Sequence, residues 1–351
     1  MFPSDKAPTL SVISGAQVHD VLDGRQRQVV EIVERTYRVH GKGATVNPPS
    51  YFLSFPDKPE ARIIALPASL GGEQGLHGLK WISSFPKNVT SGLPRASAVL
   101  VLNDQETGYP FACLESSIIS ATRTAASAAL AADVLSRDRV RPIRAGFVGA
   151  GLIARYIHTY LAGTGWSFDE IDVYDIRAEN AVAFAGCLER SGVPRVVIIR
   201  DRVEDLIRHC DLIVFATTAG TPYVHETSWF SHNPLVLHVS LRDLSPDVIL
   251  AAANVVDDVD HCLRANTSVH LTERREGNRN FLNGTLYDVM TGTCLPPADR
   301  PLVFSPFGLG VLDLAVGKFV YDEARRQGQD AVIDNFFFEL DRYGQAGKRS
   351  A

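Results

Sequence analysis

Three charged residues are of types that could act on a small charged molecule. Lys80 lies in an apolar run, and Arg123 opens an alanine-rich segment. Cations in such surroundings need anionic partners, and both residue types bind carboxylates well. A snorkelling lysine and a structural ion pair are the alternatives. Asp243 follows another apolar run, and its carboxylate could accept a proton from an amine or, alternatively, cap the helix predicted to follow it.

A glycine turn indicates a dinucleotide site. An apolar run over residues 143–148 is followed by Gly149-Ala-Gly151-Leu-Ile-Ala154, after which apolar residues recur at helical spacing. Gly149 permits the tight turn, Gly151 lets backbone N–H groups approach a pyrophosphate, and Ala154 keeps helix and strand close. A glycine turn without a ligand is the alternative, and the strand before and the helix after disfavour it.

Residues after the later strands extend this site. Asp175 ends the next predicted strand, where a carboxylate accepts ribose hydroxyls and repels a 2′-phosphate, which favours NAD over NADP. Arg177 weakens that inference because it could bind the phosphate or stack on adenine. Thr217 and Thr218 are expected to line the nicotinamide ribose, with a plain turn as the alternative. The remaining cofactor-binding candidates are Leu152, Ile153 and Ser240.

Composition limits the partners and the compartment. With 351 residues, 45% of them hydrophobic, the chain is long enough for two domains with separate cores. A formal charge of -5 provides no basic field for nucleic acid or an anionic membrane. Scattered cysteines, no apolar leader and no run of membrane-span length predict a cytoplasmic protein that binds neither nucleic acid nor membrane. No histidine spacing fits an ordinary zinc site, so no metal is expected.

The first part of the chain is predicted to form an α+β domain. Apolar residues at intervals of three and four predict one amphipathic helix over residues 15–40. Closely spaced β-type runs then predict an antiparallel sheet or partial barrel, with strands at 51–55, 62–66, 78–85, 98–103 and 109–115. An alanine-rich helix over 117–135 leads to the next domain.

The second part alternates between strands and helices. The predicted strands are 145–149, 170–175, 195–199, 211–216, 235–240 and 254–258. Such alternation specifies a doubly wound parallel sheet that binds a dinucleotide at the carboxyl ends of its strands. After residue 297 the alternation stops, and residues 304–324 are predicted to lead into a helix that packs on the first domain. The predicted fold class is therefore α/β: a Rossmann domain over 131–304, and an α+β substrate-binding and dimerisation domain built from 1–130 and 305–351.

Six segments form a specific set. They are Gly78-Leu-Lys80 with Phe85-Pro-Lys-Asn88, Gly92-Leu-Pro94, Thr107-Gly108, Ser120-Ala-Thr-Arg123-Thr-Ala-Ala, the Gly149-Ala-Gly151 turn, and Phe307-Gly-Leu-Gly-Val-Leu-Asp313-Leu-Ala. With this set the chain resembles the ornithine cyclodeaminase/μ-crystallin family along nearly its whole length. Within that family, the residues that lead to His158 and the run His238-Val-Ser-Leu-Arg242-Asp243 look like the SbnB-type 2,3-diaminopropionate biosynthesis dehydrogenases.

The resemblance implies a reaction and its partners. The reaction is NAD-dependent oxidation of N-(1-amino-1-carboxy-2-ethyl)-glutamate to an imine, which hydrolyses to 2,3-diaminopropionate and 2-oxoglutarate for siderophores or peptide antibiotics. Asp243 and Lys80 would be catalytic, and Lys80 and Arg123 would bind the small anionic amino-acid substrate. Lys87, Arg95 and Arg242 are added by proximity in sequence, because three carboxylates need more cations. A PLP-dependent synthase would make the substrate, and a sheet face that needs cover suggests a homodimer.

Two departures from the family pattern help to choose between activities. Cyclodeaminases carry a glutamate in the strand before their substrate lysine, and the aligned residue here is Ile64, which cannot hold the amino group of ornithine. The family's upstream substrate arginine has no clear counterpart in residues 46–50. The alternatives are an ornithine cyclodeaminase that releases ammonia, an NAD(P)H-dependent imine reductase, and a non-catalytic binder.

Overall fold

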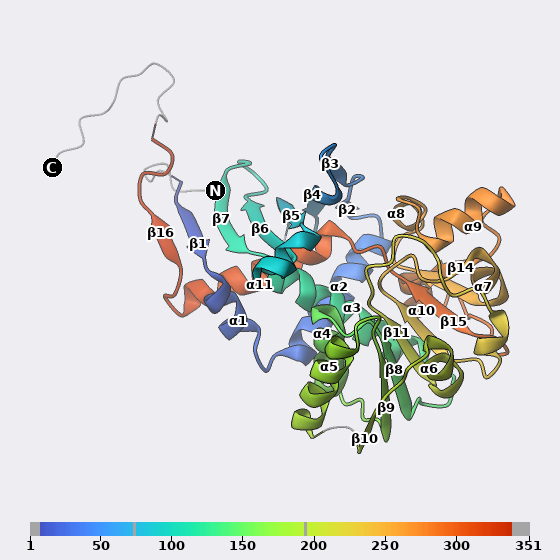
Figure 1. Cartoon of the computed structure of the whole chain (residues 1–351). Helices are drawn as coiled ribbons and strands as arrows, with labels where there is room; N and C mark the ends of the chain where they lie inside the picture. The colour runs from blue at the N-terminus through green and yellow to red at the C-terminus, as the bar shows by residue number, and fades with distance from the viewer. Residues whose placement is uncertain (1–7, 73–74, 193–194, 339–351) are drawn as a thin grey trace, which may run out of the picture. The chain divides into compact units, whose positions relative to one another are not determined.

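The computed structural model describes residues 8–72, 75–192 and 195–338, and the chain divides into two compact units (Figure 1). The first unit consists of Met1–Asp23, Gly43–Ser120 and Asp313–Ala351, and the second of Gly24–Lys42 and Ala121–Leu312. The predicted domain boundary at residue 130 lies inside helix α3 (Ser117–Leu135). The helix α2 (Gln26–Gly41), which the prediction assigned to the first domain, belongs to the second unit because it packs on α4 (Leu152–Gly163) and α10 (Leu286–Thr291).

The first unit contains a mixed sheet. Its strands, in spatial order, are β16 (Ala331–Ile333), β1 (Leu10–Ile13), β7 (Pro110–Glu115), β6 (Ala96–Asn103), β5 (Leu76–Ser84), β4 (Lys58–Leu70) and β2 (Thr45–Val46), and β3 (Tyr51–Phe55) also pairs with β4. Strand β1 runs parallel to β7, and the other pairs are antiparallel. The predicted antiparallel strands are thus present, joined by β1, β2 and β16, which the sequence pattern did not indicate.

Helices cover part of this sheet. Helix α11 (Gly310–Arg326) packs against it so closely that a Cβ atom added at Gly78 would lie 2.5 Å from Leu314 Cδ2, and one at Gly317 would lie 2.2 Å from Leu100 Cδ2. The predicted packing of the terminal helix on this sheet is therefore present. The single helix predicted over 15–40 is wrong: α1 (Gly15–Leu22) ends before Gly24, whose φ of 71° interrupts the helix, and α2 begins at Gln26.

The second unit is built on a parallel sheet. Its strands run in the order β10 (Val196–Ile199), β9 (Glu170–Tyr174), β8 (Arg144–Val148), β11 (Leu212–Phe215), β12 (Leu235–His238), β15 (Leu302–Ser305), β13 (Ala253–Val256) and β14 (Leu282–Thr285). The doubly wound prediction is confirmed. The expectation that strands end near residue 297 is wrong, because β15 inserts between β12 and β13. Its run is only four residues long and lies between prolines, so the sequence reads as a loop.

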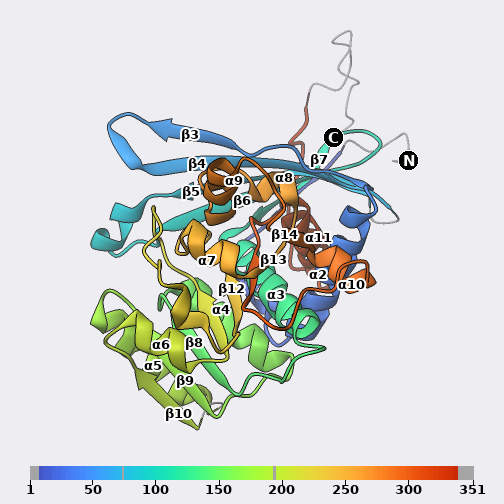
Figure 2. The same ribbon diagram turned by 90° about the vertical axis from the view of Figure 1, so that its right-hand side faces the viewer.

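Helices lie on both faces of the parallel sheet (Figure 2). Gly146 of β8 faces α6 (Val203–His209), since a Cβ atom there would lie 2.4 Å from Leu206 Cδ2. Phe147 points the other way and stacks edge-on with Phe184 of α5 (Ala178–Ser191) at 5.4 Å between ring centroids. The remaining helices of the unit are α7 (Pro246–Ala251), α8 (Val259–Cys262) and α9 (Ser268–Glu276).

Helix α3 is long and apolar enough to cross a membrane by length and composition alone. It is the only such helix in the described part of the chain, and 72% of its most apolar window is buried inside the protein. Its small side chains, from Ala125 to Ala132, have almost no exposed surface. Burial of this kind is typical of a core helix in a globular protein.

Helix α4 carries a buried histidine. His158 is 6% exposed, its Nε2 atom has no hydrogen-bond partner among the described residues, and its ring lies 6.3 Å from that of Phe147. Burial lowers the pKa of His158 from 6.5 to about 4, so the folded protein holds the neutral ring. The unfolded chain takes up a proton near pH 6.5 and the folded protein does not. The contribution of His158 to the free energy of unfolding is therefore fully present above pH 6.5 and is lost as the pH falls toward 4.

Replacing His158 with leucine should remove this pH dependence. Between pH 7 and 4.5 the histidine contributes a loss of up to about 2–3 kcal/mol in the free energy of unfolding. In urea unfolding across this pH range, the free energy of unfolding should therefore fall less steeply for His158→Leu than for wild type. His19→Leu, at a surface position, should keep the wild-type slope. Equal slopes for wild type and His158→Leu would assign the acid sensitivity to other groups.

Candidate active site

The glycine turn joins β8 to α4 with the geometry of a dinucleotide site. Gly149 has a φ of 91°, and its N–H donates to the carbonyl of Tyr174 at 2.8 Å. A Cβ atom at Gly149 would lie 2.7 Å from the carbonyl oxygen of Ala216, so the turn requires glycine. A Cβ atom at Gly151 would meet nothing within 4 Å, so the protein's own packing does not require glycine there. The open space at Gly151 is where a ligand's phosphate could approach.

The start of α4 is available to a phosphate. Gly151 is its N-cap residue and provides no side-chain cap. Leu152 is exposed and Ile153 is half-buried, while Ala154 is fully buried against the sheet, as its predicted packing role requires. Backbone N–H groups and the helix dipole favour an anion at such an end. The turn therefore fits the pyrophosphate of a dinucleotide.

Asp175 is fixed beside this turn. Its carboxylate accepts hydrogen bonds from the N–H of Ala150 at 2.8 Å and from the N–H of Arg177 at 2.9 Å. Arg177 itself is the exposed N-cap residue of α5. The carboxylate thus stands at the carboxyl end of β9, where the ribose of a bound dinucleotide lies in this fold.

Asp243 is fully buried at the carboxyl edge of the same sheet. Its carboxylate accepts hydrogen bonds from the Thr217 and Ser240 hydroxyls, and from the Tyr223 hydroxyl at 3.1 Å. The Nε2 atom of His238 lies 3.2 Å from this carboxylate and 3.1 Å from the Asp243 N–H. That nitrogen donates to the carboxylate in one tautomer and accepts from the N–H in the other. Thr217, Ser240 and Asp243, which were predicted separately, therefore form one cluster.

The surroundings keep Asp243 ionised. Burial by itself would raise the pKa of the carboxyl, but hydrogen bonds from His238, Ser240 and Thr217 outweigh burial and hold the pKa below its usual value. Burial and the charge of Asp243 raise the pKa of Tyr223, so the phenol keeps the proton that it donates. The helix-cap alternative for Asp243 is wrong, because Ser245 caps α7 by accepting from the Val248 N–H. The arrangement can hold a negative charge at the cofactor edge.

The loop before Asp243 has an unusual backbone. Leu241 has a φ of 76°, a left-handed conformation that is rare for a non-glycine residue, and its carbonyl accepts from the N–H of Ser268. Arg242 donates from Nε and Nη2 to the carbonyl of Ala265, at 3.1 and 2.7 Å. Arg242, predicted as a substrate-binding residue, thus binds a neighbouring loop in this structure. Strained backbone held by its surroundings is common at functional sites.

Lys80 lies in the first unit and is 2% exposed. Its ammonium donates to the Asp313 carboxylate at 2.7 Å and to the Ser120 hydroxyl at 3.1 Å. Asp313 is fully buried. A buried cation requires such a partner, so Asp313 both compensates Lys80 and fixes where its ammonium lies.

Arg123 lies in the second unit against the turn at Phe307 and Gly308. A Cβ atom at Gly308, whose φ is 93°, would lie 2.4 Å from Arg123 Nη1. The Asp257 carboxylate holds this turn by accepting from the N–H groups of Phe307 at 2.9 Å and Gly308 at 2.7 Å. The glycine therefore leaves room for the guanidinium, and Asp257 positions the turn on which the guanidinium rests.

Two predicted site residues lie at the surface. Lys87, predicted to bind substrate, is 83% exposed and pairs with Glu60 at 2.9 Å. Thr218 is exposed beside Thr217.

The structure also adds partners that sequence reasoning missed. Asp313, Asp257 and Tyr223 were not predicted to have roles. Of the partners of Asp243, only His238 had a visible signal in the sequence: a polar residue that follows the apolar run Leu-Val-Leu at the end of a predicted strand.

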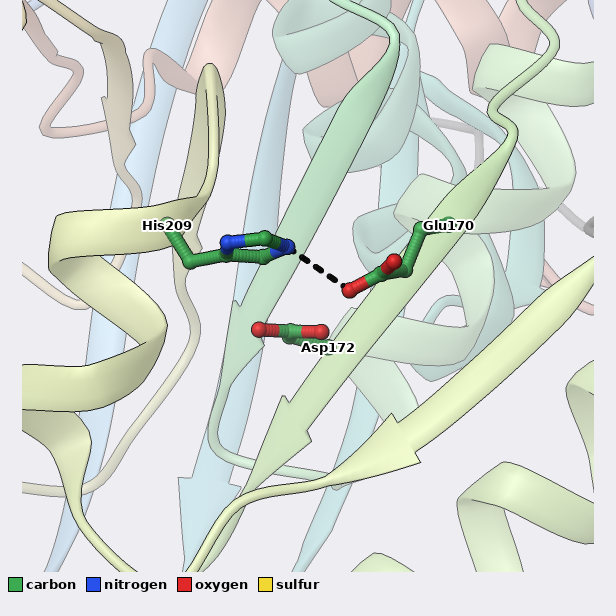
Figure 3. A group of neighbouring side chains, drawn as sticks. All are labelled: Glu170, Asp172 and His209. Carbon is green, nitrogen blue, oxygen red and sulfur yellow. Dashed lines mark hydrogen bonds and ion pairs between the residues drawn. The ribbon is translucent and has the colours of Figure 1, made fainter.

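One further cluster of titratable groups lies near the amino end of β9 (Figure 3). Glu170, Asp172 and His209 are close enough to hold a metal ion, the only such group in the described residues. His209 Nε2 lies 2.8 Å from Glu170, and Arg200 donates to Asp172 at 2.6 Å. Because Arg200 already supplies the positive charge, we interpret the cluster as a partly buried ion-pair network. It lies at the opposite end of β9 from Asp175.

Comparisons with known proteins identify the family. The Ornithine cyclodeaminase/mu-crystallin family profile matches residues 15–328, and the chain belongs to this family. It is similar to an N-((2S)-2-amino-2-carboxyethyl)-L-glutamate dehydrogenase of Staphylococcus aureus, with 29% identity over 78% of this chain and 82% of that protein. It is also 32% identical to the nodulation efficiency protein NfeD of Rhizobium meliloti, over 87% and 92% of the two chains. A solved archaeal alanine dehydrogenase dimer with bound NAD superposes with a TM-score of 0.82 at 25% identity, covering 93% of this chain and 100% of that one.

Replacing Asp243 with asparagine should mainly lower kcat. The change keeps the shape but removes the negative charge that the surrounding donors orient, and a loss on the order of 10²–10⁴-fold is expected. NAD binding, followed by fluorescence titration, should persist. Ser245→Ala, in the same loop, should lower stability by about 1 kcal/mol through the lost cap while leaving kcat unchanged. A kcat within a few-fold of wild type for Asp243→Asn would show that this carboxylate serves only to hold the loops.

Proposed function

We propose that this protein oxidises N-(1-amino-1-carboxy-2-ethyl)-glutamate with NAD, giving 2,3-diaminopropionate and 2-oxoglutarate. The family contains NAD-dependent enzymes that act on amino-acid-like substrates. The similarity to the staphylococcal dehydrogenase supports this particular substrate. Siderophore or peptide natural-product biosynthesis would use the diamino acid.

The observation that carries the proposal is the register of β4 and β5. Lys80 pairs with Leu66, and Ile64 pairs with Ile82. Side chains of directly paired residues share a face, and positions two apart along a strand return to that face. Ile64 therefore lies on the same face as Lys80, one pair further along. In the cyclodeaminases, the residue aligned with Ile64 is the glutamate that holds the ornithine amino group, and isoleucine offers no acceptor.

The residues of the glycine turn would hold the cofactor. Gly149, Gly151, Leu152 and Ile153 would hold the pyrophosphate, and Asp175 would accept the ribose hydroxyls. When bound, NAD would supply the acceptor for the hydride that leaves the glutamate α-carbon of the substrate. The chain's own task is to hold that C–H bond in place and to manage the proton on nitrogen.

Imine formation is followed by hydrolysis. Loss of the hydride from carbon and of a proton from nitrogen leaves a C=N bond in the substrate. Water adds to this imine carbon, the C–N bond then breaks, and 2-oxoglutarate and diaminopropionate separate. Lys80 and Arg123 would bind substrate carboxylates, and the ionised Asp243 would accept the proton that the amine nitrogen loses.

The partners and location follow from the same proposal. A PLP-dependent synthase that joins a serine derivative to glutamate would supply the substrate. The enzyme would act in the cytoplasm, where NAD and both amino acids are present. A homodimer is supported by the sheet face opposite Lys80, where Val12, Tyr51, Trp81 and Val99 are apolar and exposed.

The purified protein tests the reaction directly. With NAD and the glutamate conjugate it should form NADH and 2-oxoglutarate in equal amounts. NADP should support a slower reaction, because Asp175 repels the 2′-phosphate. Ornithine should give neither proline nor ammonia. Proline formed from ornithine without net NADH would replace the proposal with a cyclodeaminase.

Light scattering of the purified protein tests the dimer. Wild type should have twice the mass of one chain, and Trp81→Glu should shift it toward the monomer, because a buried carboxylate without a partner is strongly unfavourable. Circular dichroism should show that the variant stays folded. A monomeric wild type would leave the apolar sheet face without this role.

A further inference from the structure

Two arginines of the first unit lie close together without an anionic partner among the residues that the structure describes. Arg62 is on β4, and Arg95 directly precedes β6. The Nη1 atom of Arg95 donates to Ser84 Oγ at 2.8 Å, and Ser84 pairs with Arg62 across β4 and β5. The Nε atom of Arg62 is buried and has no hydrogen-bond partner within the described ranges. A buried donor without an acceptor is destabilising, so this position favours binding of an acceptor from outside the chain.

The charges around the pair also favour an anion. Glu60 is the nearest acidic residue along β4, and its carboxylate is engaged by Lys87 at 2.9 Å. Across residues 8–72, 75–192 and 195–338, neither Arg62 nor Arg95 forms an ion pair. Partial burial, together with repulsion from Arg62, lowers the pKa of Arg95. A bound carboxylate would relieve both effects.

Arg62 lies on the same sheet face as Lys80, and the side chain of Arg95 reaches this face through its hydrogen bond to Ser84. Along β5 this face presents Lys80, Ile82 and Ser84, and their partners on β4 are Leu66, Ile64 and Arg62. Ser84 is four residues from Lys80, which corresponds to about 13 Å along an antiparallel strand. The face therefore has a cation at each end and an isoleucine pair between them.

We propose that Arg62 and Arg95 bind a carboxylate at the far end of the substrate and so select a dicarboxylic amino-acid portion over a short one. This inference rests on the proposed function, in which the far carboxylate is that of the glutamate side chain. The planar guanidinium fork matches a carboxylate, and the isoleucine pair packs against the methylene groups between the two charged ends. A substrate as short as alanine, held at Lys80, leaves the arginine pair unfilled.

The experiment compares two substrates that differ only in the far charge. They are the glutamate conjugate and the same conjugate made with glutamine, whose amide is neutral and similar in shape. Wild type should prefer the glutamate conjugate. Arg62→Gln and Arg95→Gln should each lower its kcat/KM by roughly 10–100-fold, while changing the value for the glutamine conjugate less than about threefold. Lys58→Gln, which removes an exposed cation from the same strand, should change neither value.

Two outcomes would overturn the inference. One is that the wild-type enzyme does not distinguish the two conjugates. The other is that each arginine variant lowers kcat/KM equally for both conjugates while melting at the wild-type temperature. If wild type oxidises neither conjugate, the proposed function fails, and calorimetry then tests the arginine site by itself. Binding of 2-oxoglutarate in preference to 2-oxobutyrate, lost in Arg95→Gln, would support the site. Equal binding of the two oxoacids would contradict it.

Discussion

A buried negative charge organises the carboxyl edge of the second unit. The Asp243 carboxylate has no exposed surface, and a charge in that position is tolerated only when donors surround it. Those donors come from separate segments: Thr217 after β11, Tyr223 further along the same loop, and His238 at the end of β12. The requirement to satisfy one carboxylate therefore fixes the relative positions of the loops at which a dinucleotide is expected.

Paired charges are used in two different ways in this chain. Lys80 is compensated by Asp313 inside the first unit, and Asp172 by Arg200 inside the second, so each of these charges is balanced within the fold. Within the described part of the chain, Arg62 and Arg95 have no such compensation. An internal partner fixes where a charged group lies, as Asp313 does for Lys80, whereas a charged pair without a counterion indicates where the protein is adapted to bind one.

Local patterns in the sequence were sufficient for β8 to β13 of the parallel sheet and for the glycine turn, because strand alternation and a left-handed glycine are properties of neighbouring residues. The break between α1 and α2 was missed, although Gly24 was visible, because the apolar spacing continues across it. The Lys80–Asp313 pair and the register that brings Arg62 to Ser84 were beyond reach, since they depend on contacts between distant segments. The low pKa of Asp243 could not be predicted either, because burial alone predicts a shift in the opposite direction.

The position of β15 has a consequence for the order in which the molecule can form. This strand is the last of its sheet in sequence, yet it lies between β12 and β13. A nascent chain that ends before residue 302 therefore has β12 and β13 with open edges that face a gap, and exposed edges of this kind promote aggregation. The parallel sheet of the second unit cannot close until residues 302–305 have been synthesised, so a ribosome that pauses in the segment before β15 would hold the chain in an aggregation-prone state.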